Sequence, residues 1–282
     1  MGNTENLLKK RLAIIKDRAK RLREIRESAP PPQLFAAPGE TCTLADAAPG
    51  EGRVIESCPF YLIRTTADAD AEEAPRVAAD FARLAGDAAW VNSFLSENSR
   101  RSSALQTTAE KVCFFDIETT GLSANTYVFL CGMMFYENGK FVIEQAFARD
   151  YSEELGMLLY TKDLFSQFDI LVSYNGRSFD VPFVTTRMAV GKIEYAGPKE
   201  HIDLLYPARN TFADKLLNCR LETIERHLRG MDREGDIPGS EIPEAYHSFV
   251  RDGDASLIKR ILYHNRMDLL TMGIILNHLA AV

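Results

Sequence analysis

The chain reads FFDIETTG over residues 114–121, where two acidic residues follow a run of apolar ones. The run from Val112 to Phe115 is typical of a buried strand. Side chains two residues apart on a strand point to the same side, so Asp116 and Glu118 are expected to project together at the strand's end. Two buried carboxylates repel one another unless a cation binds or one is protonated. A divalent metal with oxygen ligands is the simplest solution, although such pairs also occur on exposed strand ends.

A third acid, Asp180, lies in a second segment, YNGRSFDVPF at residues 174–183, after the apolar stretch DILVSY. The dipeptide Asn175-Gly176 predicts a sharp turn, and a helix is expected to begin near Asp180. Asp180 could be a metal ligand, or it could simply cap a helix whose first turn contains Pro182. Asn175 could likewise be no more than a turn residue.

The third segment, HNRMDLLTM at residues 264–272, lies within a long helical pattern. His264 and Asp268 are four residues apart, which places them on one face of that helix. Taken alone, such a pair is more typical of a structural hydrogen bond than of catalysis. It gains meaning only together with the other acids.

Together the three segments resemble the DEDD superfamily of ribonuclease-H-like 3′-to-5′ exonucleases. FDIETTG is similar to the first motif, N-x-x-x-F-D ending at Asp180 to the second, and His264-x-x-x-Asp268 to the third, in the same order. Residues from about 111 to 279, which include HIDLLYPAR, CRLETIERHL and GDIPG, further resemble the bacterial YprB-type ribonuclease-H-like domain, a predicted exonuclease group.

The resemblance implies a two-metal site for Mg²⁺ or Mn²⁺ with the ions about 3.5 to 4 Å apart. By resemblance, Asp116 bridges both ions, Glu118 and Asp268 complete the first site, and Asp180 serves the second, largely through water. One ion would activate a water, and the other would stabilise the leaving 3′ oxygen. His264 is the candidate for orienting or deprotonating that water, because a pKa near 6.5 suits a general base.

The identity of the base stays open between two neighbours. Tyrosine branches of the superfamily place Tyr in Y-x-x-x-D, and histidine branches place His in H-x-x-x-x-D. Here His264 has the spacing of the tyrosine, and Tyr263 has the spacing of the histidine.

The same resemblance implies a set of residues that contact the terminal nucleotide. Leu122 would pack on a base, and backbone amides of the turn would lie near the 3′ end. Gly121 could equally mark a tight turn, and Phe179 could be a core aromatic. The full set is Thr119, Thr120, Gly121, Leu122, Asn175 and Phe179.

The pattern from residue 107 onward predicts an α/β domain of ribonuclease-H-like fold, residues 107–282, with a mixed five-stranded sheet flanked by helices. Asn138-Gly139 predicts a hairpin between two of the strands. A helix is expected at about 152–167. Residues 31–106 form an accessory region of unknown function, with one strand candidate, RVIESCPFYLIRTT, and one helix candidate, APRVAADFARLAGDAAW.

Residues 1–30 predict a basic amphipathic helix, with nine Lys or Arg against four Asp or Glu. It could dock on its own domain, self-associate, bind a protein partner or grip nucleic acid. The rest of the chain holds 24 basic and 36 acidic residues, and the total net charge of −7 argues against a protein that coats nucleic acid. The expected partner is instead a few nucleotides of a single-stranded 3′ end, of DNA or RNA.

Composition indicates a cytoplasmic protein without a membrane span or an apolar signal segment. The five scattered cysteines favour reduced thiols over disulfides or a zinc site. Two rivals to an exonuclease stay open: a structure-selective endonuclease on the same fold, and a catalytically idle nucleic-acid-binding or scaffold protein.

Overall fold

The computed structural model describes residues 42–87, 90–94, 107–195 and 197–281. The predicted basic helix at residues 1–30 lies outside the described residues. In the part of the chain that is described, no helix is long and apolar enough to cross a membrane.

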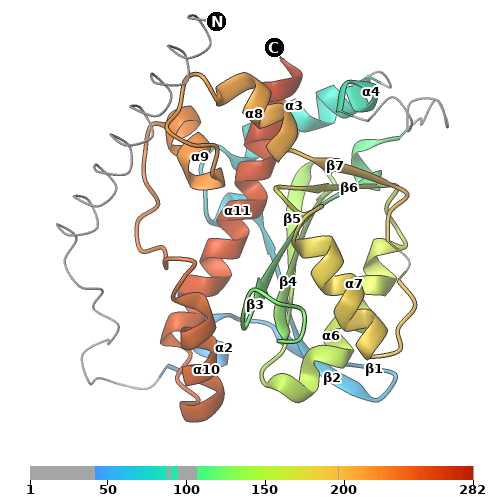
Figure 1. The fold of residues 1–282 in the computed structure, drawn as a ribbon, viewed down its shortest axis with the longest axis vertical. Helices are drawn as coiled ribbons and strands as arrows, with labels where there is room; N and C mark the ends of the chain where they lie inside the picture. The colour runs from blue at the N-terminus through green and yellow to red at the C-terminus, as the bar shows by residue number, and fades with distance from the viewer. Residues whose placement is uncertain (1–41, 88–89, 95–106, 196, 282) are drawn as a thin grey trace, which may run out of the picture. The chain divides into compact units, whose positions relative to one another are not determined.

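One mixed sheet of seven strands, in the order β1-β2-β5-β4-β3-β6-β7, runs through the described residues (Figure 1). Strand β3 lies between β4, with which it pairs antiparallel, and β6, with which it pairs parallel. Strand β7 is parallel to β6. The predicted α/β fold with a mixed sheet is therefore confirmed. The strands are β1 (Glu51–Ile55), β2 (Cys58–Thr66), β3 (Val112–Thr119), β4 (Val128–Glu137), β5 (Lys140–Phe147), β6 (Ile170–Ser173) and β7 (Glu200–Asp203).

The sheet has two strands more than the five predicted, because β1 and β2, from the region expected to be accessory, join it. The expected single strand RVIESCPFYLIRTT is a hairpin of these two strands. The chain reverses at Glu56 and Ser57, whose φ angles are 48° and 67°. This two-residue turn has no glycine or asparagine, the residues that usually reveal such turns. Strand β2 then pairs antiparallel with β5 and extends the sheet. The boundary at residue 107 stays a prediction.

The hairpin between β4 and β5 is confirmed at Asn138-Gly139. Both residues have positive φ, 51° and 86°, and the flanking pair is Glu137 and Lys140. Asparagine and glycine adopt positive φ more readily than other residues, which is why this pair predicts the turn.

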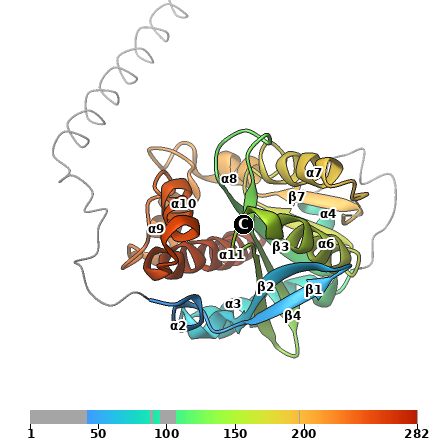
Figure 2. The ribbon, with the colours of Figure 1, turned by 90° about the horizontal axis from the view of Figure 1, so that it is seen from below.

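Helices cover both faces of the sheet (Figures 1 and 2). On one side lie α6 and α7, and on the other α3 and α11. The helix expected at about 152–167 is confirmed as a short 3₁₀ turn (Tyr151–Glu153) followed by α6. The helices are α2 (Leu44–Ala47), α3 (Ala74–Ala85), α4 (Trp90–Phe94), α6 (Glu154–Phe165), α7 (Asp180–Val190), α8 (Leu205–Phe212), α9 (Leu221–Arg229), α10 (Ile242–Asp252) and α11 (Ser256–Ala280), and further 3₁₀ turns are Ala67–Ala69 and Ala109–Lys111.

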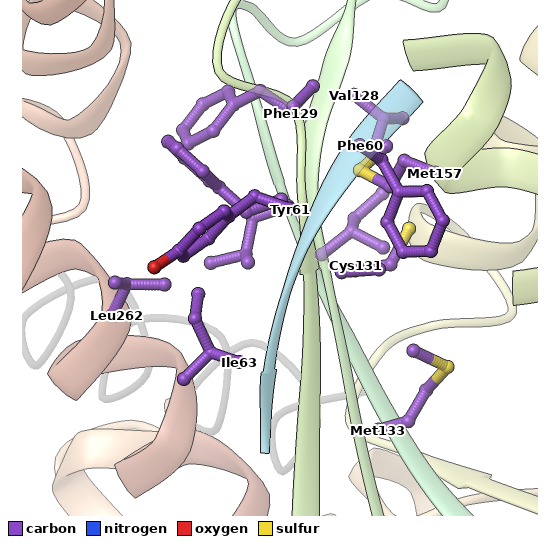
Figure 3. Packing of buried hydrophobic residues seen from close by; sticks show 14 of the residues in the cluster. Phe60, Tyr61, Ile63, Val128, Phe129, Cys131, Met133, Met157 and Leu262 are labelled. Atoms are coloured by element: carbon purple, nitrogen blue, oxygen red, sulfur yellow. The ribbon is translucent and has the colours of Figure 1, made fainter. Parts of the chain in front are cut away.

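The strands bury alternate residues on their two faces. Figure 3 shows Phe60 near Met157 of α6, whereas Ile63 lies toward Leu262 of α11. On β3, Phe115 joins the cluster that holds α6 and α7 residues, and Phe114 joins the cluster that holds residues of α3 and α11. Asp116 and Glu118 continue the face of Phe114, so they point toward α11.

Candidate active site

The acidic end of β3 extends past its parallel neighbour. The pairing with β6 ends at Phe114 and Val172, so the backbone beyond that point lacks a partner on this side. Asp180 supplies a partner there instead, because its Oδ1 accepts a hydrogen bond from the Ile117 N–H at 3.3 Å. Asp180 is the first residue of α7 and not its cap, a position taken by Phe179. The second acidic segment is thus brought to the first.

The turn that carries Asp180 is anchored by Asp203 at the end of β7. Asn175 adopts a left-handed conformation with φ of 64°. Asp203 is 5% exposed, and its carboxylate accepts hydrogen bonds from the backbone N–H groups of Asn175 at 2.8 Å and Arg177 at 3.0 Å. This role was not predicted from the sequence, although HIDLLYPAR places an acid directly after a strand.

Helix α11 holds Asp116 through a buried amide. The Asn265 side chain donates a hydrogen bond from Nδ2 to Asp116 Oδ2 at 2.8 Å. Its own Oδ1 accepts one from Gln145 Nε2 at 2.8 Å, and both amide residues are fully buried. Neither was predicted from the sequence. A glutamine within the otherwise apolar strand FVIEQAFA is a signal that could have found this network, because buried polar groups need partners.

Close packing makes Gly132 part of this arrangement. Gly132 lies opposite Asp116 on β4, and a Cβ atom there would stand 2.1 Å from Asn265 Oδ1. We expect Gly132→Ala to displace the Asn265 amide and lower the free energy of unfolding by about 1 to 3 kcal/mol, a typical cost of overpacking. Thermal denaturation measures this. The double variant Gly132→Ala/Asn265→Ala should regain stability relative to Asn265→Ala alone; an equal loss in both backgrounds would contradict the proposed clash.

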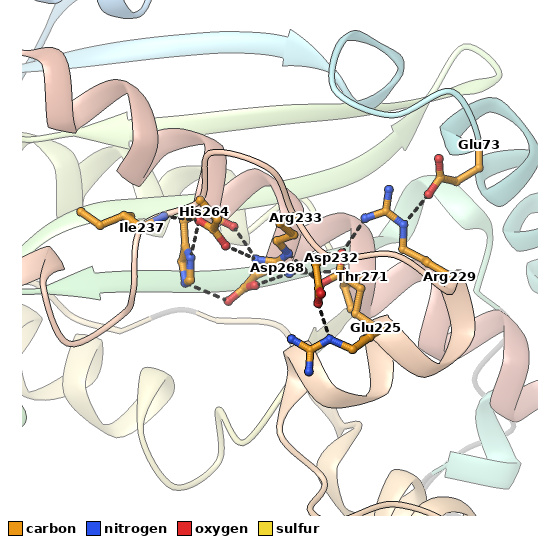
Figure 4. Close-up of polar contacts among 11 residues, drawn as sticks. Glu73, Glu225, Arg229, Asp232, Arg233, Ile237, His264, Asp268 and Thr271 are labelled. Carbon is orange, nitrogen blue, oxygen red and sulfur yellow. Dashed lines mark hydrogen bonds and ion pairs between the residues drawn. The ribbon is translucent and has the colours of Figure 1, made fainter. Parts of the chain in front are cut away.

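Asp268 is held by a buried arginine from the loop after α9 (Figure 4). Arg233 Nη2 lies 2.6 Å from Asp268 Oδ1, and the Arg233 side chain is 6% exposed. The contact is an ion pair between two partly or fully buried side chains. Arg233 also pairs with Glu225 at 2.6 Å and with Asp236 at 3.3 Å. One guanidinium therefore compensates three carboxylates.

His264 lies between two of these acids. Its Nδ1 is 2.9 Å from Asp236 Oδ1, and its Nε2 is 3.6 Å from Asp268 Oδ2. Tyr263 instead packs at the edge of the apolar cluster beneath α3. Arg233 and Asp236 were not predicted as site residues, although Asp236 belongs to the segment GDIPG that carries part of the resemblance.

The electrostatics follow from burial and crowding. Burial, followed by the charges of Asp268 and Asp180, raises the pKa of Asp116 well above its usual value. Burial and the neighbouring carboxylates raise the pKa of Glu118 to about 8, although His264 opposes this shift, and burial raises that of Asp180 to about 7. For His264, burial is outweighed by the hydrogen bond to Asp236 and by nearby carboxylates, which raise its pKa to about 9.

These four acids, Asp116, Glu118, Asp180 and Asp268, fit a site for divalent cations by their chemistry. Carboxylate oxygens are the ligands that Mg²⁺ and Mn²⁺ prefer, and a cation would relieve the repulsion that raises the pKa values of three of them. In this structure, however, the four side chains do not adopt the arrangement of metal ligands. Among the described residues, no group of three or more His, Cys, Asp or Glu side chains is arranged so that it could hold a metal ion.

The residues expected to contact a nucleotide lie after β3 and β6, two adjacent parallel strands whose ends face the same way. Thr119 Oγ1 donates a hydrogen bond to the Gly121 carbonyl at 2.7 Å, and Thr120 bonds to Tyr127 across the loop. Leu122 is 91% exposed. Phe179 packs partly buried against the core, with its ring 5.5 Å from that of Phe183.

The sequence matches a known family and a known relative. Residues 113–280 match the family model described as the RNase_H superfamily. The "Uncharacterized protein YprB" of Bacillus subtilis (strain 168) is 33% identical over 165 residues, which cover 56% of this chain. The match spans about two fifths of that relative, 39% of its length.

Among solved structures, a family B DNA polymerase from the hyperthermophilic archaeon Pyrobaculum calidifontis aligns with a TM-score of 0.44 and 18% identity. The alignment covers 61% of this chain and 27% of the polymerase. A likeness of this strength supports no argument about function.

Proposed function

Because the chain belongs to the RNase_H superfamily and carries a YprB-type ribonuclease-H-like domain, we propose that it is a 3′-to-5′ exonuclease that depends on divalent metals. The substrate would be a single-stranded 3′ end of DNA or RNA. One observation carries the proposal: buried carboxylates from β3 and α7 meet Asp268 of α11 beside His264, and burial together with their mutual charge raises the pKa values of Asp116, Glu118 and Asp180.

In this proposal, Asp116, Glu118, Asp180 and Asp268 hold two Mg²⁺ or Mn²⁺ ions. When bound, the ions would supply activation of a water and stabilisation of the leaving oxygen. Compensation of the carboxylate charges would also return His264 to its neutral form, which a general base requires.

The protein's own residues then perform the proton transfer. The water oxygen bonds to phosphorus as the bond between phosphorus and the 3′ oxygen of the preceding nucleotide breaks. His264 Nε2 takes the proton of the water, and the leaving 3′ oxygen takes one from solvent. The products are a 5′-mononucleotide and a strand shortened by one residue.

A digestion panel tests the proposal. Single-stranded and duplex DNA and RNA, labelled at the 3′ or the 5′ end, are incubated with the full chain and Mg²⁺, Mn²⁺ or chelator. We expect stepwise shortening from the 3′ end in the arms with Mg²⁺ or Mn²⁺ and none in the arm with chelator. Cleavage of a closed single-stranded circle would indicate an endonuclease, and binding without hydrolysis in every arm would indicate an idle nucleic-acid-binding protein.

A further inference from the structure

The loop between α9 and α10 places one carboxylate, Asp236, behind the ring of His264. Asp236 Oδ1 lies 2.9 Å from His264 Nδ1, and the same oxygen accepts the backbone N–H of Ile237 at 2.8 Å. An oxygen that already accepts one N–H is an acceptor for the ring as well. In the neutral His264 ring, the Nδ1 atom is therefore the nitrogen that carries the proton.

The opposite ring nitrogen faces the carboxylates of the candidate active site. His264 Nε2 lies 3.6 Å from Asp268 Oδ2, and the side chains of His264 and Asp236 are 11% and 14% exposed. With Nδ1 protonated, the neutral ring presents its lone pair from Nε2 on this side. A ring turned by half a revolution would lose the bond to Asp236.

Asp236 is itself held from three directions. Arg233 Nη1 lies 3.3 Å from Asp236 Oδ2, and Arg260 of α11 donates hydrogen bonds to the carbonyls of Gly235, at 3.0 Å, and Asp236. The next residue, Ile237, is 2% exposed and packs in the core. A carboxylate fixed in this way can hold a ring in one orientation, which a solvated side chain cannot.

We propose that Asp236 is a positioning residue that fixes the tautomer and orientation of His264, so that Nε2 can accept a proton from the attacking water. The inference rests on the proposed nuclease function. In this role Asp236 acts through His264, and it does not itself take part in the proton transfer.

Kinetics of Asp236→Ser and Asp236→Asn in the full chain test this role. Serine can still accept the Ile237 N–H but is too short to reach the ring, whereas asparagine keeps the acceptor oxygen. We expect Asp236→Ser to lower kcat by about 10- to 100-fold with KM nearly unchanged, and Asp236→Asn to recover most of the loss. The matched control is Asp232→Ser in the same loop, where Asp232 pairs with Arg226 and its side chain is 70% exposed; it should leave kcat unchanged.

Two measurements separate positioning from a purely structural effect. In a His264→Ala background, Asp236→Ser should have no further effect on kcat, because the residue through which it acts is gone. In histidine-labelled protein without metal, the Nδ1–H proton of His264 should exchange slowly with water in the wild type and in Asp236→Asn, and rapidly in Asp236→Ser.

The inference is overturned if Asp236→Ser slows the His264→Ala variant as much as it slows the wild type, or if the protected Nδ1–H proton survives in Asp236→Ser. If the wild type is an active nuclease and Asp236→Ser has the same kcat, the inference is overturned while the proposed function stands. A wild type without nuclease activity would overturn this inference together with the proposed function.

Discussion

Asp116→Asn is expected to abolish metal-dependent hydrolysis, with kcat/KM lowered at least about 10³-fold, as for residues that act as one catalytic unit. Burial and the charges of Asp268, Asp180 and Glu118 raise the pKa of Asp116, so a bound cation should interact strongly with this carboxylate. Asparagine keeps an oxygen that can accept the hydrogen bond from Asn265, and the fold should therefore be retained. Rates on a labelled single strand with Mn²⁺ measure the loss.

The same substitution should stabilise the protein in the absence of metal. The pKa of Asp116 is raised in the folded state, so the folded protein binds the proton more tightly, and its stability falls as the pH rises above the ordinary carboxyl value. Asparagine cannot ionise and escapes this loss. We expect the Tm of Asp116→Asn to exceed that of the wild type at pH 8 in chelator, and the difference to shrink toward pH 4.

Asp252→Asn is the matched control for Asp116→Asn. Asp252 ends α10, pairs with Arg251 and has a side chain that is 52% exposed. The change should alter neither rate nor Tm. An Asp116→Asn protein with wild-type activity would show that the carboxylate cluster is not the site of hydrolysis.

Arg233→Met is expected to cause the largest loss of stability, about 3 to 5 kcal/mol, because it removes the arginine that pairs with Asp268 and one of the two arginines that pair with Glu225. Glu225 is 3% exposed at its side chain, and Asp268 is 16% exposed. Methionine fills a similar volume but supplies no charge. For a chain of this size the loss corresponds to a Tm lower by about 10 °C, measurable by calorimetry.

Two further variants identify the cause. Arg226→Met removes an arginine from the end of α9, where it pairs with Asp232 in solvent, and should change stability by less than about 0.5 kcal/mol. In Arg233→Met/Glu225→Gln, the carboxylate that has lost one of its two arginine partners is neutralised, so the double variant should be more stable than Arg233→Met alone. If Glu225→Gln brings no recovery, the charge of Glu225 is not the cause of the loss.

The acids of the site follow from local patterns, whereas their supporting residues do not. The apolar run before Asp116 predicts the strand, its end and the shared face of Asp116 and Glu118, because strand periodicity is a local property. The contact of Asn265 with Asp116 joins positions 149 residues apart. No local pattern encodes that contact, nor the pairing of Arg233 with Asp268, because both arise from how helices and loops pack on the sheet.

The sequence did not predict the β1–β2 hairpin, and the reason is different. Its turn at Glu56 and Ser57 has positive φ in residues that seldom adopt it, and the antiparallel pairing of β1 with β2 holds the reversal in place. Tertiary contacts override turn propensity here.

A chain of contacts also runs from Asp116 through Asn265, Gln145 and Arg266 to Asp70, which pairs with Arg266 at 2.6 Å. Asp70 lies outside the residues that match the family. The part of the chain that matches the family is therefore smaller than the part whose contacts support the candidate active site. A fragment cut at residue 107 would leave the β5 edge unpaired and open to aggregation, and Arg266 without its counter-ion. Engineers who transplant this RNase H-like domain should carry residues 42–94 with it.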